Sequence, residues 1–439
     1  MRVGQGDGSH LLRVLGVAFG IAAVIGGTIG QGILRAPGLV AKGVPDARII
    51  ILLWVVGGAF AIVDAMSTVE LAAAIRRTGG PYAFASRVFG PFVGLATGIA
   101  DWLAYVGVGA FVSVVLGEYL HRLGIATAVP VPALALLAIL AVGVIQALGT
   151  RIGGASQEIG SAIKATMFLV LIVVLMVAPR GAPVATAAPS PAITVIGLIV
   201  AIRAIVGTYL GWGQAAYYCE EVKDPGRSIA RATFSGIALV TLIYVLVNVA
   251  FLMVLTPSEM AGSPLVAADA AARVFGPSAS TVVTAISLIS LLTILNLSMM
   301  TYPRLIYAIG RDVGIPGLSH VAANGSPQLA LALMVGASAL LATVGVYEAL
   351  LAFSVWLMTS VALCVNLAVL TLRRREPALE RPYRMPLFPL PAVFSLLVNV
   401  TLLGAFLYES PATAVRASVL LAVVVAAVYL ITRRREAIA

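Results

Sequence analysis

Residues 22–37 read AAVIGGTIGQGILRAP and lie inside an apolar segment that runs from about residue 14 to 40. Four glycines fall within seven of these residues: Gly26, Gly27, Gly30 and Gly32. Because each glycine costs about 1 kcal/mol relative to alanine in a helix interior, the pattern predicts a membrane helix with an unwound middle. Backbone groups freed in lipid must be bonded by protein or by a water-lined cavity, so we expect this segment to line a cavity. The alternative is close helix packing through small residues, which Gly26 and Gly30 alone would satisfy.

The two half-helices on either side of this predicted break would present opposite charges to the cavity. The half after the break exposes N–H groups and the positive end of its dipole, and the half before it exposes carbonyl oxygens. A zwitterion would satisfy both ends. The pattern therefore predicts a small-molecule site at mid-depth in the membrane.

The composition is typical of a polytopic membrane protein. Of the 439 residues, 61% are hydrophobic and 10% are charged, whereas about a quarter of a soluble protein is charged. The net charge is +10, and the Lys and Arg residues lie mostly in short connectors between apolar runs. This distribution is typical of the loops of a membrane protein, so we expect no nucleic-acid partner. Cys219 and Cys364 both fall near the predicted cytoplasmic side and have no metal-ligand pattern around them, so we expect no disulfide, metal site or cofactor.

Counting about 20 residues per crossing predicts an all-α protein with twelve membrane spans. They cover residues 14–40, 48–74, 89–118, 130–149, 157–178, 193–219, 231–255, 279–301, 327–346, 349–371, 389–408 and 412–432. With the N-terminus inside, 19 of the 28 Lys and Arg residues are cytoplasmic and 6 are external, leaving Arg35, Lys164 and Arg203 within spans. Because cytoplasmic connectors carry an excess of Lys and Arg, we predict a plasma (inner) membrane protein with both termini cytoplasmic.

The sixth predicted span repeats the glycine pattern of the first. Residues 205–213 read IVGTYLGWG, an apolar run interrupted by three glycines at matching depth. Two copies of five spans have opposite orientations, so residues 14–178 and 193–371 are predicted to form an inverted repeat whose two broken helices meet at the midplane. Residues 389–432 fall outside the repeat and are predicted to be two peripheral helices, for packing or for a homodimer.

The chain resembles the amino acid–polyamine–organocation transporter superfamily, most closely its L-type and bacterial amino acid exchanger branches. The resemblance covers the first ten spans and rests on four ordered motifs: GGTIGQGILRAPG at 26–38, VELAAAIRRTGGPYAFASRVFG at 69–90, GTYLGWGQAAYYCEEVKDPGRSIARA at 207–232 and TYPRLIYAIGRDVGIP at 301–316. It implies a five-plus-five inverted-repeat fold and alternating access to a site between spans one and six.

The resemblance also implies which residues contact the substrate. The substrate carboxylate would meet the unwound part of span one, which here comprises Gly27, Gly30, Gln31 and Gly32. The α-ammonium group would meet carbonyls near Thr28, Gly207 and Leu210. The family often has serine where this chain has Gln31, a longer amide that would narrow the pocket or alter the contact with the carboxylate.

Gates are expected at both ends of the site. L-type members carry a bulky aromatic gate where this chain has Gly207, so closure is expected from another side chain, Tyr209 or Trp212. On the cytoplasmic side, one set of charged residues would form a gate or else lie as ordinary solvated loop charges: Arg76, Glu220, Glu221, Lys223, Arg304 and Arg311.

Lys164 lies near the cytoplasmic end of the fifth predicted span. One reading is a lysine whose ammonium reaches the membrane surface along its own alkyl chain. The resemblance implies another, because in sodium-independent members a lysine at this place in span five stands where sodium sits in sodium-coupled relatives. Its ammonium would then bond the freed carbonyls of span one directly.

Two carboxylates are predicted to lie within the membrane. Asp64 and Asp101 fall in spans two and three, where an unpaired charge is costly, so each is expected to have a partner or to hold a proton. Proton carriage is one role for them and a satisfied structural carboxylate is the other. Asn296 in span eight would shape the pocket or only pack.

Two arginines lie toward the external ends of spans one and six. Arg35 and Arg203 would attract anionic groups, or would pair with Asp101 or Glu118. Interhelix pairing and a role at the mouth of the site both remain open for them.

The predicted function is sodium-independent secondary transport of amino acids by exchange or facilitated diffusion. Small or medium neutral substrates are favoured unless Asp101 or Glu118 reaches the pocket. A proton-coupled symporter is the alternative, and a channel or membrane sensor is a remote one that lacks a TVGYG-like filter. No nucleophile–base pair or metal cluster indicates an enzyme.

Overall fold

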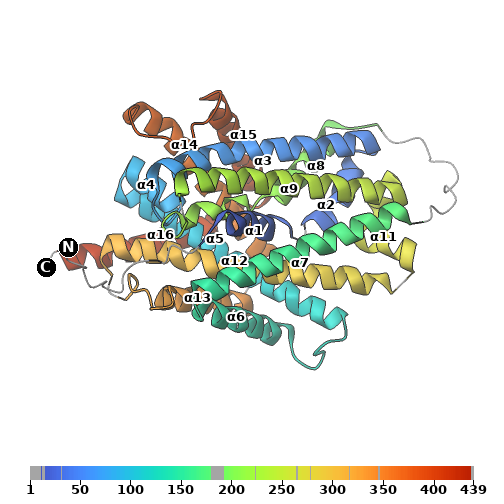
Figure 1. Cartoon of the computed structure of the whole chain (residues 1–439), viewed down its shortest axis with the longest axis horizontal. Coiled ribbons are helices and arrows are strands. Elements are labelled where there is room, and N and C mark those ends of the chain that lie inside the picture. The colour runs from blue at the N-terminus through green and yellow to red at the C-terminus, as the bar shows by residue number, and fades with distance from the viewer. Residues whose placement is uncertain are drawn as a thin grey trace.

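In the computed structural model the chain forms an elongated bundle of helices (Figure 1). The structure describes residues 11, 15–30, 32–178, 192–222, 224–263, 265–276, 278–315, 317–344 and 347–436. These residues form no β-strand, and one isolated bridge pairs Leu15 with Val222. The protein is therefore nearly all-helical, as its composition predicts.

The helices lie where the apolar runs of the sequence lie. In chain order they are α1 Val17–Thr28, α2 Gly32–Gly43, α3 Ala47–Ile75, α4 Pro81–Phe89, α5 Pro91–Arg122, α6 Val131–Ala147, α7 Thr150–Val177, α8 Val195–Tyr209, the 3₁₀ helix η1 Trp212–Tyr218, α9 Pro225–Val254, α10 Pro257–Gly262, α11 Val266–Phe275, α12 Ala279–Val313, α13 Gln328–Val344, α14 Tyr347–Arg375, α15 Leu390–Glu409 and α16 Pro411–Glu436. Within the described ranges, nine spans are long and apolar enough to cross a membrane, or ten if α1 and α2 count as one bent span. Helices α6 and α13 are apolar but shorter.

Three short helices lie in regions predicted as connectors, namely α4, α10 and α11. α4 begins at Pro81 and is flanked by Gly80 and Gly90, both at positive φ. α10 begins with a capping box in which Thr256 and Glu259 bond each other's backbone N–H groups. Flanking glycines and a capping box are local signals that do not need a 20-residue apolar run, so counting membrane spans misses them.

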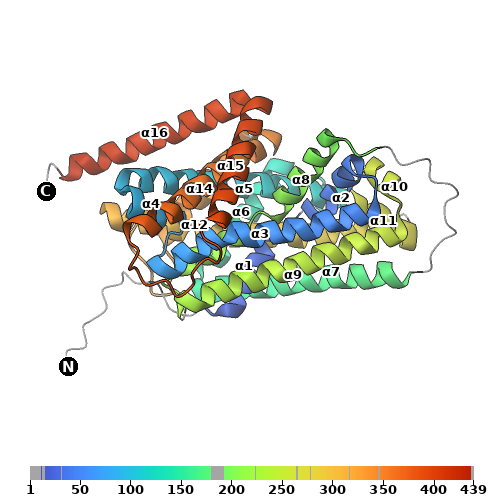
Figure 2. The same ribbon diagram turned by 90° about the horizontal axis from the view of Figure 1, so that it is seen from above.

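Helix α5 forms the centre of the bundle and α16 its edge. In its most apolar window 83% of α5 is buried, against 17% for α16. α5 packs against α4, α6, α12, α13 and α14, whereas α15 lies on α3 and α14, and α16 lies on α5 and α14. Figure 2 shows α16 along the outside of the bundle.

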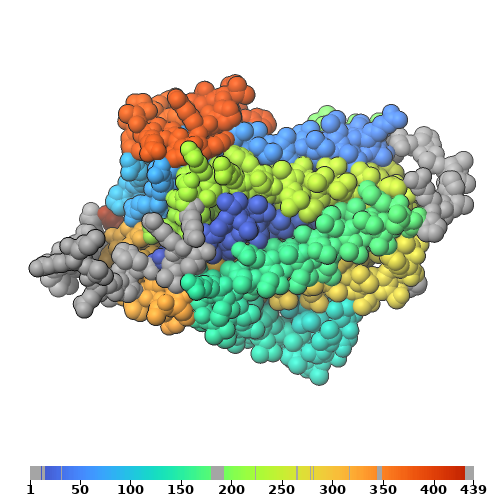
Figure 3. Space-filling view, in the orientation of Figure 1, coloured from blue at the N-terminus to red at the C-terminus, as the bar shows by residue number. Residues whose placement is uncertain are grey.

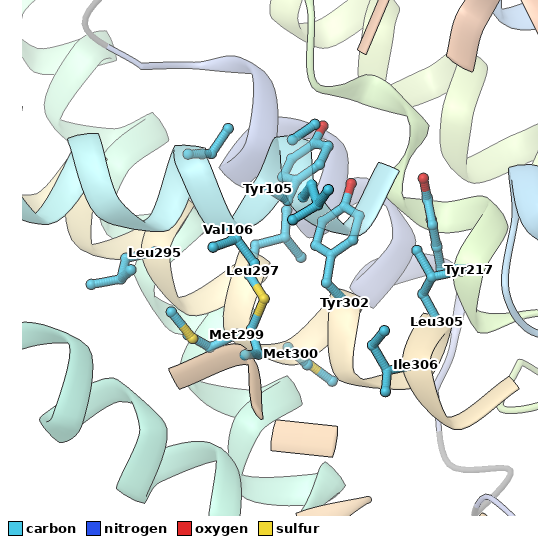
Figure 4. Packing of buried hydrophobic residues seen from close by; sticks show 14 of the residues in the cluster. Tyr105, Val106, Tyr217, Leu295, Leu297, Met299, Met300, Tyr302, Leu305 and Ile306 are labelled. Carbon is cyan, nitrogen blue, oxygen red and sulfur yellow. The ribbon is translucent and has the colours of Figure 1, made fainter. Parts of the chain in front are cut away.

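The two broken helices lie inside this frame. α1 packs against α7 and α9 and also against η1, and Figure 3 shows it as a dark blue patch between α9 and α7. α2 packs against α8. The largest apolar cluster lies beside them on α5 and α12, where Tyr105, Leu297 and Tyr302 meet (Figure 4). The first break is thus packed among other helices, which is what exposed backbone groups require.

Candidate substrate site

The first break separates α1 from α2, whose axes differ by 50°. Gln31 lies outside the described residues, and Ile29 and Gly30 are the described residues between the two helices. Lys164 of α7 is fully buried, and its Nζ donates to the carbonyls of Gly26 at 2.9 Å and Ile29 at 2.6 Å. These bonds satisfy carbonyls that the end of α1 leaves without helical partners.

A tyrosine of α9 ties the ends of the two broken helices together. The Tyr244 hydroxyl lies 2.9 Å from the Thr28 carbonyl oxygen at the end of α1 and 3.1 Å from the Thr208 carbonyl oxygen near the end of α8. The Ser161 hydroxyl also donates to the Ala22 carbonyl at 2.8 Å. Side chains from α7 and α9 therefore donate hydrogen bonds to backbone carbonyl oxygens of α1.

The second break separates α8 from η1. α8 ends at Tyr209, and Gly211 has a φ of 108°, a region that side-chain-bearing residues rarely adopt. A Cβ added to Gly27 would lie 2.5 Å from the Gly211 carbonyl oxygen, so the two breaks meet backbone to backbone. Two glycines are needed there because no side chain fits between the segments.

A cavity of about 550 Å³ lies beside the second break. Its walls come from α3, α5, α8, η1, α12, α14 and α15, and five predicted site residues line it: Asp64, Asp101, Gly207, Leu210 and Trp212. Its volume falls within the range of small-molecule sites, about 300–1,000 Å³. The second break is therefore open to a cavity large enough for an amino acid.

The other described residues predicted for the site do not line this cavity: Gly27, Thr28, Gly30, Gly32, Lys164, Tyr209 and Asn296. The glycines of the first break are packed against their neighbours, since a Cβ at Gly30 would lie 2.9 Å from Ile294 and one at Gly32 would lie 3.1 Å from Thr208. The expectation that the first break lines a cavity is therefore not met at this cavity, because protein groups occupy the space around it.

Tyr209 and Asn296 have other partners. The Tyr209 hydroxyl donates to the Trp54 carbonyl at 2.9 Å, which turns the ring toward α3. Asn296 bonds Gln146 at 2.7 Å and Gln157 at 2.8 Å, so its amide joins α6, α7 and α12. Of the two side chains predicted to close the site, Trp212 is the one at the cavity wall.

The two carboxylates in the spans have polar neighbours. Asp101 is buried and accepts a hydrogen bond from the Tyr217 hydroxyl. Asp64 is partly buried and lies near Asn366 and Ser395. Both carboxylates thus have neighbouring hydrogen-bonding groups, as expected for acidic side chains in a membrane.

One of the two intramembrane arginines forms an interhelix ion pair, which is one of the predicted alternatives. Arg203 forms an ion pair with Glu409 at the cavity wall, not with Asp101 or Glu118. The Arg35 guanidinium lies 3.5 Å from the Tyr119 hydroxyl. Of the alternatives for Arg203, interhelix pairing therefore holds, with Glu409 at the end of α15 as the partner in place of Asp101 or Glu118.

Two ion pairs anchor the chain just after η1. Arg304 and Glu221 are both buried, with Nη2 and Oε1 3.0 Å apart, and Arg304 also donates to Thr150 at 3.1 Å. Arg311 contacts Glu220 through two hydrogen bonds, of 2.9 and 3.1 Å. Burial alone would raise the pKa of Glu220, but the Arg311 guanidinium lowers it below its usual value. Lys223 lies outside the described residues.

Sequence reasoning passed over two tyrosines of this region. Tyr217 belongs to the motif at 207–232 but was not singled out, and Tyr244 lies in the apolar run of α9, which also contains Thr241 and Asn248. A polar side chain in an otherwise apolar span is the signal that could have drawn attention to Tyr244, since polar groups in membrane helices need partners.

Two broken helices that meet inside a bundle of apolar helices, beside a partly polar cavity, define a secondary transporter. The chain belongs to the amino acid permease family, whose profile matches residues 13–429. It is therefore a membrane transporter and not an enzyme, and the predicted superfamily and exchanger branch are confirmed.

Several relatives are similar over nearly the whole chain. The serine/threonine exchanger SteT of Bacillus subtilis is 24% identical over 91% of this chain and 92% of its own. The b(0,+)-type amino acid transporter 1 of Mus musculus is 28% identical over 92% of this chain and 84% of its own. The human cystine/glutamate transporter is 26% identical, covering 92% and 82%. These relatives are amino acid transporters and exchangers.

Proposed function

We propose that this protein is a sodium-independent amino acid carrier that works by exchange or facilitated diffusion through alternating access. Amino acids are proposed as the substrates because the chain belongs to the amino acid permease family and because its relatives are named as amino acid exchangers and transporters. We further propose that the chain crosses the membrane twelve times, with α6 and α13 as complete spans.

The observation that carries the sodium independence is the position of the Lys164 amine. Nζ donates to two carbonyls at the end of α1, at 2.9 and 2.6 Å. A sodium ion bound by the same carbonyls would stand beside this amine. Two unit charges 4 Å apart repel by about 4 kcal/mol at an effective dielectric of 20, which is roughly a thousandfold loss of affinity. An ammonium there takes the place of a bound cation.

The substrate would bind where the two breaks meet. In this proposal its carboxylate contacts the N–H groups of Gly27, Gly30, Gln31 and Gly32, and its α-ammonium contacts carbonyls near Thr28, Gly207 and Leu210. The closeness of Gly27 to Gly211 supports the arrangement, because it brings one break next to the cavity that the other lines. Trp212 at the cavity wall would close over the substrate.

The topology proposed for the carrier is a five-plus-five inverted repeat of residues 14–178 and 193–371, with α15 and α16 outside it. Breaks in both α1–α2 and α8–η1 support it. The proposal also takes both termini to be cytoplasmic and the protein to lie in the plasma (inner) membrane, which the excess of Lys and Arg in the predicted cytoplasmic connectors supports. The homodimer predicted for residues 389–432 has no support from the relatives and stays a prediction.

A proton-coupled symporter is the second candidate. The observation that favours it is the presence of two carboxyl groups, Asp64 and Asp101, in the wall of the cavity. A carboxyl group that gains and loses a proton as the cavity changes sides would couple substrate movement to a proton gradient.

Uptake into proteoliposomes separates these possibilities. Vesicles preloaded with unlabelled amino acid are expected to take up labelled amino acid equally in sodium and in choline buffer, because Lys164 replaces the ion. Dependence on sodium would contradict the proposal. Uptake that needs an inward proton gradient and no internal amino acid would favour the symporter over exchange.

The preference for small or medium neutral substrates depended on the position of Asp101. It assumed that neither Asp101 nor Glu118 reaches the pocket, and Asp101 lines the cavity. Neutral amino acids are therefore one of two substrate classes to be compared in this assay. The second class is the one that the acidic residues of the cavity wall would favour.

A further inference from the structure

The cavity wall carries an excess of negative groups. Its described lining contains three acidic residues and one basic one: Asp64, Asp101, Glu409 and Arg203. Arg203 is paired with Glu409. Among the ion pairs of the described residues, none joins Asp64 or Asp101 to a basic side chain. Two carboxyl groups therefore face the cavity without a cation of the protein beside them.

Three tyrosines gather beside Asp101. Tyr217 donates its hydroxyl hydrogen bond to Asp101. The rings of Tyr105 and Tyr302 are stacked with their centroids 3.9 Å apart, and those of Tyr217 and Tyr302 are 5.3 Å apart. All three line the cavity and are buried. Figure 4 shows them side by side, contributed by α5, α12 and η1, with their hydroxyl oxygens pointing the same way.

A carboxylate together with aromatic rings is suited to bind a cation. A ring face attracts an ammonium or guanidinium group within about 6 Å of its centroid, and a buried carboxylate is stabilised by an opposite charge. A zwitterionic amino acid with a neutral side chain brings no net charge to the two carboxyl groups. A basic amino acid brings one positive charge, which reduces the cost of their burial.

We propose that Asp101, Tyr105, Tyr217 and Tyr302 form a subsite for the cationic end of the substrate side chain, so that the carrier prefers basic amino acids. The inference rests on the proposed amino acid transport and names the substrate class of that site. Gln214 supports the subsite, since its Nε2 donates to the Tyr105 hydroxyl at 2.9 Å. Asp64, which also lines the cavity, adds a second acidic group.

Matched ligand pairs test the subsite on the wild-type protein. L-arginine is compared with its neutral isostere L-citrulline, and L-lysine with L-norleucine, by thermal stabilisation of the purified protein as a measure of binding. We expect each basic ligand to bind at least tenfold more tightly than its neutral partner. Equal affinities within both pairs would overturn the subsite, and so would tighter binding of the neutral members.

Substitutions test which residues cause the preference for basic ligands. Asp101→Asn is expected to reduce the arginine-to-citrulline affinity ratio by about tenfold, and Tyr217→Phe by less, because the carboxylate remains. Glu118→Gln is the matched control, since Glu118 lies on the same helix, is exposed and does not line the cavity. A ratio unchanged in Asp101→Asn would show that the carboxyl group is a neutral structural group and would overturn the subsite. If Asp101→Asn does not fold, the matched ligand pairs on the wild-type protein and the affinity ratio of Tyr217→Phe still test the subsite.

The failure of the subsite and the failure of the proposed function are distinguishable. Exchange of neutral amino acids in proteoliposomes without a preference for basic ones would overturn only the subsite. Tight, Asp101-dependent binding of L-arginine without any uptake would support the subsite and contradict the proposed transport.

Discussion

The two helix breaks carry similar sequence patterns and have different surroundings. At the break between α1 and α2 the carbonyls of Gly26 and Ile29 are bonded by Lys164, and the glycines pack against neighbouring atoms. At the break between α8 and η1, the residues from Leu210 to Gln214 line a cavity. A Cβ added to Gly207 or Gly213 would have no atom within 4 Å.

This difference separates two uses of glycine. In the first break glycine allows other groups to approach the backbone, including the Gln157 amide at Gly26 and the Gly211 carbonyl at Gly27. In the second break only Gly211 has a positive φ, 108°, which favours glycine. Gly207 and Gly213 have open space where a side chain would lie. The first break is closed, and Lys164 of α7 and Tyr244 of α9 bond its carbonyls. The second break is open to the cavity and is followed by the two ion pairs after η1.

The largest effect is expected from removing the anchor of the second break. Arg304→Met leaves the Glu221 carboxylate buried without its partner, which typically costs about 3–5 kcal/mol of unfolding free energy. We expect a large loss of melting temperature in detergent. The double variant Arg304→Met with Glu221→Leu should recover part of it, because it leaves no buried charge unpaired.

Arg76→Met is the control for this experiment. Its partner Glu380 has a side chain that is 81% exposed, so this pair is expected to contribute little. If Arg304→Met were no more destabilising than Arg76→Met, the second break would not depend on the anchor.

The positions of the helices could be predicted from the sequence, because a run of apolar residues long enough to cross a membrane has few alternatives to a helix. All twelve predicted segments contain helices, and both predicted breaks occur. The short helices α4, α10 and α11 are too short to cross a membrane, and α10 begins with a capping box, which hydropathy does not detect.

The site was predicted less completely than the fold. Glycine patterns indicate where a helix unwinds, but they do not indicate which side chain from another helix fills the gap. Tyr209 was expected at the gate and bonds Trp54 instead, and Asn296 bonds Gln146 and Gln157. Such pairings depend on the rotation of each helix about its axis, which packing determines and spacing alone does not.

The second prediction concerns the lysine that fills the first break. Lys164→Met keeps an unbranched side chain one atom shorter and removes the donor to two buried carbonyls, and an unsatisfied buried group costs about 1–3 kcal/mol. We expect a lower melting temperature and loss of transport. Ile163→Met, at the neighbouring exposed position, is the control. Full stability and uptake in Lys164→Met would mean that the first break is not closed by this amine.

A third prediction compares glycines within the second break. Gly211→Ala places a Cβ against the Gly27 backbone at a positive φ, and overpacking of this kind typically costs about 1–3 kcal/mol. Gly207→Ala adds a methyl group to open space and should leave the melting temperature unchanged or slightly higher. Equal losses in the two variants would remove the distinction between a glycine needed by the backbone and one that borders the cavity.

The smallest effect is expected from the partly exposed half of the anchor, where Glu220 contacts Arg311. Although burial opposes it, Arg311 lowers the pKa of Glu220 in the folded protein below its unfolded value. The pair therefore contributes its full stability above the unfolded pKa of about 4.3 and loses it as the pH falls through the lower folded pKa. Because both side chains are partly exposed, we expect a contribution of about 1 kcal/mol or less.

Melting temperatures of wild type and Glu220→Gln, measured from pH 7 down to pH 3.5, check this prediction. The difference between the two should stay constant down to about pH 4.5 and then shrink, because Glu220 becomes protonated and resembles the glutamine. A difference that grew on acidification would mean that Glu220 is stabilised in its protonated form. The η1 end would then be anchored by Arg304 and Glu221 alone, and the second break would have a single anchoring ion pair.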